Sequence, residues 1–450
     1  MACIEPRVLK GFRDFLPPQE LTRREMVEKI ERSFRSFGFV PIDTPALEYA
    51  EILLGKGGGE TEKQVYRFTD QGGREVALRF DLTVPFARFM AEHRAELTLP
   101  FKRYHIAKVW RGENTQRGRY REFTQCDFDI AGSSSPGADF EILLLIRNTL
   151  GSLTGGQKPA GRGVTVRLNH RGLFNRFLAS LGAGDQSVEV LRRVDKLAKI
   201  GLEGVRELLG ELLGEEQSRR VLDYISLGKE GDFNQTLKKL KAAAGEGEDT
   251  QRLEALGHWM KDTGTEAGFV LDPSITRGLD YYTGVVFETF LDQLPGIGSV
   301  CSGGRYDNLA GLYSSERIPG VGASIGLDRL QAALEELGGG TARPGPGAAV
   351  ACLGEGEAGR AQALAEEFRA RGLTCEVFLE PKKLTQQFIL AEKRGIPWVI
   401  VPPEKAASPG GPLTLRNIPA RESREGLTIE AAAALIRDGA RDSATPPSLP

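Results

Sequence analysis

The stretch from residue 101 to residue 130 constrains the fold more than any other part of the chain. It holds two strand-like runs separated by the glycine-bounded loop 112–118. Two such runs joined by a short loop predict an antiparallel hairpin. Further strands are expected at 64–69, 75–80, 285–290 and 299–302. Helical spacing of apolar residues predicts helices at 22–37 and 326–337, and 39–48 is expected to be a short strand broken by prolines.

Positive charge is concentrated in this hairpin. Between residues 101 and 121 there are seven lysines and arginines against one acidic residue, Glu113, which leaves a local charge of +6. The whole chain carries 59 basic and 61 acidic residues, a net charge of −2. A protein that binds nucleic acid through bulk charge would be basic. Any contact with RNA must therefore use local basic patches.

The second strand of the hairpin has two different faces, because successive side chains of a strand alternate. One face collects Arg119, Arg121, Phe123, Gln125, Asp127 and Asp129, and the other collects Tyr120, Glu122, Thr124, Cys126, Phe128 and Ile130. Arginines bind phosphate oxygens through paired hydrogen bonds, and an aromatic ring can stack on a base. The first face therefore indicates a phosphate ligand with a planar base. A solvent-facing strand with charges of both signs explains the pattern equally well.

Two segments place aromatic or basic residues beside glycines. In 277–284, Tyr281 and Tyr282 lie between glycines, close to Arg277 and Asp280, which suits a pocket for a polar ligand. A turn leading into the strand 285–290 is the alternative. In 301–307, two consecutive glycines allow the backbone to approach a ligand closely, or form only a tight turn.

Two further segments suggest charged ligands. In 320–329, small residues alternate along a strand that leads into a helix, and Arg329 falls in the first turn, where anions are favoured. The segment matches neither a dinucleotide fingerprint nor a P-loop. Asp81 and Thr83, at a strand end, could hold an ammonium group. Either of them could instead cap the helix that follows.

Several other patterns exclude classes of site. The glycine-rich stretch 55–60 lacks a strand–helix frame, so a mobile loop is favoured over a phosphate loop. The four histidines lack metal-ligand spacing, and no metal site is expected. The five cysteines form no CxxC pair, which suggests reduced thiols in a cytosolic protein. There is no secretory h-region and no apolar run long enough to cross a membrane.

The domains follow from changes in pattern. A core is expected in two parts, 1–151 and 266–340, with a helical insertion at 152–265 between them. A linker is expected at 341–348. Residues 345–438 read as an α/β domain with a β–α–β–α–β pattern, and 439–450 as a disordered tail.

Seven segments together resemble the histidine–tRNA ligase family over residues 7–438. KGFRDFLP resembles the family's opening signature, and FGFVPIDTPALE resembles the class II dimerisation motif, which ends at Pro45. WRGENTQRGRYREFTQCDFDI and GVGASIGLDRL resemble the second and third class motifs. RGLDYYTGVVFE and SGGRYDNL resemble the two histidine-specific signatures, and LRFDLTVPFAR is closer to the eukaryotic-like form of its motif.

The resemblance implies an α+β fold with a class II antiparallel-sheet catalytic core, a helical insertion and a C-terminal α/β anticodon-binding domain. It implies a cytoplasmic homodimer that uses ATP with Mg²⁺, L-histidine and tRNA(His). The domain 345–438 has 12 basic and 12 acidic residues, so its bulk charge gives no support for RNA binding. Splayed bases can still be read by stacking and hydrogen bonds.

The resemblance also implies residue roles. The expected ATP contacts are Arg111, Arg119, Phe123 and Arg329. The expected histidine contacts are Asp81, Leu82, Thr83, Arg111, Gln125, Asp129, Arg277, Tyr281 and Tyr282. Arg111 and Arg277 would be catalytic, at the reacting carboxylate and α-phosphate. The alternatives are a non-catalytic paralogue, such as a regulatory subunit of ATP phosphoribosyltransferase, and a module that senses uncharged tRNA. The first usually lacks the C-terminal domain, and the second accompanies kinase or other domains.

Overall fold

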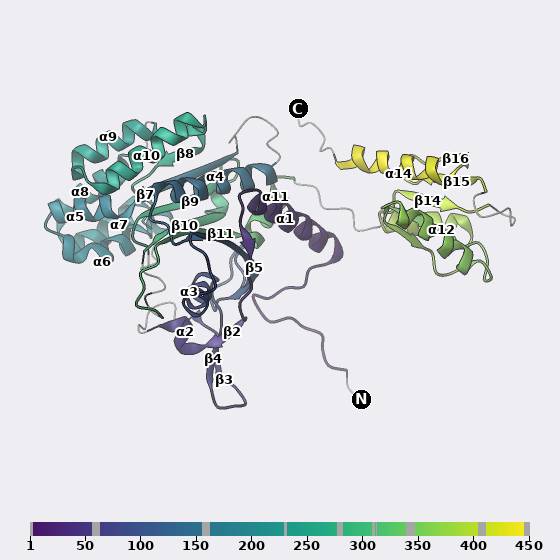
Figure 1. The fold of residues 1–450 in the computed structure, drawn as a ribbon, viewed down its shortest axis with the longest axis horizontal. Coiled ribbons are helices and arrows are strands. Elements are labelled where there is room, and N and C mark those ends of the chain that lie inside the picture. The colour runs from purple at the N-terminus through teal and green to yellow at the C-terminus, as the bar shows by residue number, and fades with distance from the viewer. Residues whose placement is uncertain are drawn as a thin grey trace. The chain divides into compact units, whose positions relative to one another are not determined.

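The structure is a computed structural model that describes residues 3–55, 64–154, 163–228, 232–276, 282–307, 311, 313–338, 347–403 and 411–444. Two compact units are present. The first consists of residues 1–14 and 25–339, and the second of residues 15–24 and 340–450 (Figure 1). Among the described residues, no helix is long and apolar enough to cross a membrane.

A large sheet of eight strands forms the centre of the first unit, in the order β1-β5-β6-β11-β10-β9-β7-β8. Its neighbouring strands are antiparallel except for the pairs β1–β5 and β7–β8. The bounds are β1 Val40–Pro41, β5 Phe101–Trp110, β6 Glu122–Ala131, β11 Gly320–Gly326, β10 Cys301–Tyr306, β9 Val285–Leu291, β7 Val164–His170 and β8 Phe269–Leu271. The predicted hairpin at 101–130 is confirmed as β5 and β6.

One face of β6 packs on the main hydrophobic core. Cys126, Phe128 and Ile130 are buried there, in one cluster with Phe34 of helix α1 (Pro17–Ser36). Helices α4 (Pro136–Leu153) and α11 (Leu327–Glu336) contribute to the same core. The helix predicted at 22–37 is confirmed as α1, but it begins earlier, at Pro17. A proline is tolerated in the first turn of a helix.

A small sheet lies beside the large one, in the order β2-β4-β3. Its strands are β2 Leu47–Tyr49, β3 Arg67–Thr69 and β4 Glu75–Leu78, with helices α2 Ala50–Leu54 and α3 Thr83–Glu92 after β2 and β4. The hairpin expected at 64–69 and 75–80 is confirmed with shorter strands. The run 39–48 yields two strands in different sheets instead of one strand, because Pro41 and Pro45 interrupt it.

The region expected to be a helical insertion is only partly helical. Strand β7, within 152–265, belongs to the large sheet and pairs with β9, because Val164, Val166 and Leu168 alternate as a half-buried strand requires. The helices follow it: α5 Arg171–Ser180, α6 Ser187–Val194, α7 Leu197–Leu213, α8 Glu215–Ser226, α9 Phe233–Ala244 and α10 Glu248–Asp262. Their buried side chains are continuous with the core of the sheet.

The second unit contains a five-stranded sheet in the order β13-β12-β14-β15-β16. The elements are β12 Ala348–Val350, α12 Ala358–Ala370, β13 Cys375–Val377, α13 Leu384–Lys393, β14 Trp398–Val401, β15 Leu413–Asn417, β16 Glu422–Leu427 and α14 Ile429–Ala444. The predicted β–α–β–α–β pattern is confirmed, with parallel pairing of β12 to β13 and β14. The hairpin β15–β16 was not predicted. The predicted disordered tail is wrong for residues 439–444, which belong to helix α14. Residues 445–450 lie outside the described residues.

Candidate active site

The polar face of β6 turns away from the main core and carries a buried carboxylate held from two sides. The ion pair between Arg103 Nη2 on β5 and Asp129 Oδ2 measures 2.6 Å. The Tyr306 hydroxyl, at the end of β10, donates a hydrogen bond of 2.7 Å to Asp129 Oδ1. Arg103, Asp129 and Tyr306 are all buried. Three strands of the sheet therefore fix one carboxylate at this point.

Two further carboxylates, Asp127 and Asp81, are buried near Asp129. Burial raises the pKa of Asp127 to about 7, and the neighbouring negative charge of Asp129 also raises it. Burial likewise raises the pKa of Asp81 and of Asp129. The Oε1 atom of Gln125 is buried without a hydrogen-bond partner among the described residues. A cationic group that donates hydrogen bonds would stabilise the ionised carboxylates and satisfy this amide oxygen.

The position of Asp81 and Thr83 differs from the expected strand end. Strand β4 ends at Leu78, and Thr83 is the first residue of α3. The Asp81 carboxylate accepts a hydrogen bond of 3.1 Å from the backbone N–H of Val84, which is the capping role considered as the alternative. The Thr83 hydroxyl lies 3.5 Å from Asp127 Oδ2, so the helix start borders the same carboxylate cluster. Leu82, between them, is fully buried.

Most of the basic side chains behind the local charge of +6 already have partners within the protein. Lys102 pairs with Glu141, Lys108 with Glu122, Arg117 with Glu336, and Arg121 donates to the carbonyls of Glu113 and Lys10, while Arg103 pairs with Asp129 as described. Arg111 and Arg119 remain, and both face Glu113, at 3.7 and 3.8 Å. The hairpin therefore offers two arginines to a ligand, not a broad basic patch.

A third arginine joins these two from the start of α11. Burial lowers the pKa of Arg329 to about 10, and the positive charge of Arg119 lowers it further. Arg329 Nη1 donates 2.6 Å to the carbonyl of Ser299. Gly118 approaches it so closely that an added Cβ would lie 3.3 Å from Arg329 Cα. Three mutually repelling arginines on converging elements favour a polyanionic ligand.

Phe123 lies between the arginines and the carboxylates on the same strand face. The guanidinium carbon of Arg111 is 5.3 Å from the centre of the Phe123 ring. The Arg111 Nε donates 2.8 Å to the carbonyl of Phe80, which fixes the guanidinium next to the segment that contains Asp81. Arg111 is therefore placed between the acidic cluster and the other arginines.

Glycines on two adjacent strands make room for the acidic cluster. A Cβ at Gly322 of β11 would lie 1.9 Å from Asp129 Oδ1, and a Cβ at Gly304 of β10 would lie 2.7 Å from the Tyr282 ring. Gly303 and Gly304 are interior residues of β10, so the tight turn considered for 301–307 is wrong at this point. The buried ring of Tyr282 packs over the strand where Gly304 leaves space.

Comparisons with known proteins identify the family to which the chain belongs. Residues 11–330 match the histidyl-tRNA synthetase family, and residues 348–438 match the anticodon binding domain. The chain belongs to the histidyl-tRNA synthetase family. It is 55% identical to the histidine–tRNA ligase of Treponema denticola over 88% of both chains. The crystal structure of histidyl-tRNA synthetase from Nostoc sp. PCC 7120 superposes with a TM-score of 0.84 at 31% identity, over 97% of this chain and all of that one.

A third comparison concerns the paralogue considered above. A Bacillus halodurans structure described as an ATP phosphoribosyltransferase regulatory subunit/histidyl-tRNA synthetase superposes with a TM-score of 0.72 at 22% identity, over 87% of this chain and 97% of that one. This likeness shows the shared fold alone. The much higher identity to a histidine–tRNA ligase therefore favours the synthetase over the regulatory paralogue.

Part of the site predicted for this member of the histidyl-tRNA synthetase family lies outside the described residues. These site residues are Arg277 and Tyr281. Residues 56–60 of the glycine-rich stretch and 341–346 of the predicted linker also lie outside the described residues. The sequence analysis did not predict the two residues that bind the Asp129 carboxylate, Arg103 and Tyr306. Arg103 was counted only as part of the local positive charge, although its register opposite Asp129 on a hairpin could have indicated the pair. Tyr306 stood in a singled-out motif but was given no role.

Proposed function

We propose that this chain joins L-histidine to tRNA(His) through a histidyl-adenylate, with ATP as the energy source. The observation that carries the proposal is the division of one strand face into two regions. The acidic region is the buried part that contains Gln125 and Asp129. The basic region contains Arg111 and Arg119, and Phe123 lies beside Arg111. One region suits an ammonium and an imidazole, and the other suits a nucleoside triphosphate.

The acidic region is the proposed histidine pocket. Asp81, Thr83 and Gln125 hold the α-ammonium, which adds a second cation, beside Arg103, to the three buried carboxylates. Asp129 and Tyr282 face the imidazole. Leu82, buried just before α3, packs against the pocket. Arg277 and Tyr281 complete the pocket on the grounds of family resemblance.

The basic region is the proposed ATP site. Arg111 holds the α-phosphate and the histidine carboxylate together, because it lies between the two regions. Arg119 and Arg329 hold the outer phosphates, and the lowered pKa of Arg329 reflects charge that phosphates would compensate. The Phe123 ring stacks on adenine.

The reaction needs no nucleophile from the protein. The histidine carboxylate attacks the α-phosphorus in line, the bond to the bridging oxygen breaks, and pyrophosphate leaves. The terminal ribose hydroxyl of the tRNA then attacks the adenylate carbonyl, and AMP leaves with the bonding electron pair. Arg111 and Arg277 stabilise charge at the reacting centre, so positioning and electrostatics supply most of the catalysis.

Mg²⁺ is proposed to enter with ATP. No group of three histidine, cysteine or acidic side chains that could hold a metal is found among the described residues. Mg²⁺ is commonly bound through phosphate oxygens with one or two carboxylates. Glu113, which faces Arg111 and Arg119, is the residue placed to contribute one. The cation would neutralise charge on the leaving pyrophosphate.

The remaining assignments follow from the family and from exposed surfaces. Val40, Leu47 and Tyr49 are 47%, 40% and 48% exposed, and these apolar side chains, in or beside the segment that resembles the class II dimerisation motif, agree with a homodimer. The C-terminal α/β unit is proposed to bind the anticodon of tRNA(His). The buried free thiols of Cys126, Cys301, Cys352 and Cys375 support a reducing, cytoplasmic location.

Charging of a tRNA(His) transcript tests the whole proposal. The purified chain, with ATP, Mg²⁺ and labelled histidine, is expected to attach histidine to this transcript and not to a transcript for another amino acid. A protein that activates histidine but transfers none would retain the first half of the proposal and overturn the second. A protein that does neither would behave as the regulatory paralogue.

A further inference from the structure

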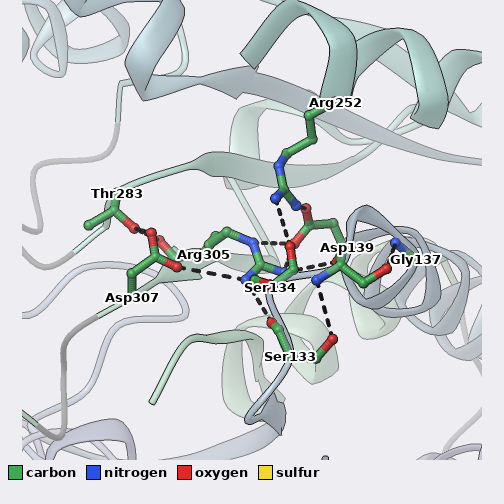
Figure 2. Close-up of polar contacts among 9 residues, drawn as sticks. Ser133, Ser134, Gly137, Asp139, Arg252, Thr283, Arg305 and Asp307 are labelled. Atoms are coloured by element: carbon green, nitrogen blue, oxygen red, sulfur yellow. Dashed lines mark hydrogen bonds and ion pairs between the residues drawn. The ribbon is translucent and has the colours of Figure 1, made fainter. Parts of the chain in front are cut away.

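Asp139, in the first turn of α4, is a buried anion at the junction of three segments of the first unit. Its side chain is fully buried, and two guanidinium groups reach it from different elements (Figure 2). Arg305 of β10 approaches Oδ1, with Nη2 at 2.6 Å and Nε at 2.8 Å. Arg252 of α10 approaches Oδ2, with Nη1 at 2.5 Å. The carboxylate therefore joins the central sheet to the last helix of the helical segment.

Arg305 anchors the end of β10. Its Nη1 donates 2.9 Å to the carbonyl of Ser133, and its Nη2 donates 3.3 Å to the carbonyl of Ser135 (Figure 2). Both carbonyls belong to the connection between β6 and α4. The guanidinium thus ties β10 to the chain that continues directly from the strand carrying Asp129.

The anchored end of β10 borders the histidine pocket on two sides. The next residue, Tyr306, points to the opposite face and bonds Asp129. The carbonyl of Arg305 accepts 2.8 Å from the N–H of Thr283, which directly follows Tyr282. A shift of Arg305 would therefore move both a bonding partner of Asp129 and the chain beside Tyr282.

Arg252 is not needed to balance charge at this point. Arg305 and Asp139 already form a neutral buried pair, and Asp307, 3.8 Å from Arg305 Nη1, is itself paired with Arg317. Arg252 adds a second positive charge, and its Nη2 donates 2.7 Å to the carbonyl of Ser134. Its contribution is geometric, because it holds the free side of the Asp139 carboxylate and the Ser134 carbonyl against α10.

We propose that Arg252 is a positioning residue for histidine recognition, and that its bonds to Asp139 and to the Ser134 carbonyl hold Arg305 in place beside the histidine pocket. The inference rests on the proposed function, since it concerns the same pocket. Histidine affinity then depends on a side chain that does not itself line the pocket. ATP affinity does not, because the arginines of the basic region lie in the hairpin loop and on α11.

The test compares two arginine substitutions in the same helical segment. Arg252→Met removes the link to Asp139 and keeps most of the side-chain volume. Arg176→Met is the matched control, because Arg176 of α5 pairs with the buried Asp249 at the start of α10 and donates to Gly245 O, so it removes another contact of α10 and keeps the pairs of Asp139 with Arg252 and Arg305. The side chains of Arg252 and Arg176 are 19% and 32% exposed, so both variants should fold.

Histidine binding is measured by calorimetry, and the KM values for histidine and ATP by pyrophosphate exchange. For Arg252→Met we expect histidine affinity to fall about three- to tenfold, with the KM for ATP changed less than about twofold. Arg252→Lys, which keeps a charge near Asp139, should recover part of the loss. Arg176→Met should leave both substrates within about twofold, whatever its effect on Tm.

The outcomes separate the two proposals. If the wild-type protein binds no histidine, the proposed function fails and the inference fails with it. If the wild type binds histidine and Arg252→Met binds it equally well, only the inference is overturned. Equal losses in Arg252→Met and Arg176→Met, or equal losses for histidine and ATP, would also overturn it, because they would show a general structural role.

Discussion

The Tyr306 hydroxyl donates a hydrogen bond of 2.7 Å to Oδ1 of Asp129, while the other carboxylate oxygen of Asp129 lies 2.6 Å from Arg103. Both oxygens of a fully enclosed carboxylate are thus held before any ligand arrives. Each oxygen of the fixed carboxylate can accept a further hydrogen bond, so the site favours a ligand that donates one in the right direction.

Removing the Tyr306 hydroxyl should therefore weaken histidine binding. In Tyr306→Phe, one oxygen of Asp129 loses its donor, and a lost hydrogen bond to a charged group costs about 1.5–3 kcal/mol. We expect the KM for histidine to rise about tenfold or more in pyrophosphate exchange, with the KM for ATP nearly unchanged. An unchanged KM for histidine would show that Tyr306 has only a packing role.

Gly322 should tolerate no side chain, because of its distance to Asp129. A Cβ there would lie 1.9 Å from Asp129 Oδ1, whereas a Cβ at Gly326, on the same strand, would meet its nearest atom at 3.9 Å. Gly322→Ala is expected to abolish most histidine activation, and Gly326→Ala to retain it. Comparable activity of the two variants in pyrophosphate exchange would contradict the described packing.

Arg329 is expected to act on ATP and not on histidine. Its pKa is lowered by burial and by Arg119, so a phosphate ligand should relieve the repulsion. Arg329→Met should raise the KM for ATP about tenfold or more and leave histidine binding by calorimetry within about twofold. Arg117→Met, which removes an exposed pair with Glu336, is the control. A larger loss for histidine than for ATP would exclude the proposed role.

Asp127 should make the stability of the ligand-free protein depend on pH. Burial raises the pKa of Asp127 from 3.8 to about 7 in the folded state. The folded protein therefore keeps a proton that the unfolded chain releases, and this contribution is lost as the pH rises from about 4 to about 7, at about 1.4 kcal/mol per pH unit. Between about pH 5.5 and about pH 8, the wild type should lose about 2 kcal/mol relative to Asp127→Asn. Urea unfolding measures this, and parallel pH profiles would show that Asp127 does not titrate in that range.

Local patterns were sufficient to predict the sheet that supports the site. The hairpin β5–β6, the strand-to-helix step at Gly326 and the parallel part of the C-terminal sheet each follow from short-range periodicity. The alternation along β6 also placed Phe123, Gln125 and Asp129 on one face. These features depend on neighbours in the sequence, which is where period-2 and period-3.6 patterns carry information.

The parts that were missed depend on contacts between distant residues. Arg103 counted only as part of the local positive charge, and only its pairing across the hairpin and its burial reveal a partner for Asp129. Strand β7 was absorbed into a helical region because it is a single strand among helices, and its partners β9 and β8 lie far along the chain. The hairpin β15–β16 was overlooked because β16 is almost wholly exposed and polar, so no apolar alternation marks it.

Histidine-dependent exchange of pyrophosphate into ATP tests the central claim most directly, because it requires the acidic and basic regions to act on two substrates together. With Mg²⁺ present, the purified protein is expected to catalyse exchange with histidine and not with other amino acids. Arg111→Ala, which removes the residue between the two regions, should lower the rate about 100-fold or more. No exchange with histidine, or equal exchange with several amino acids, would contradict the account.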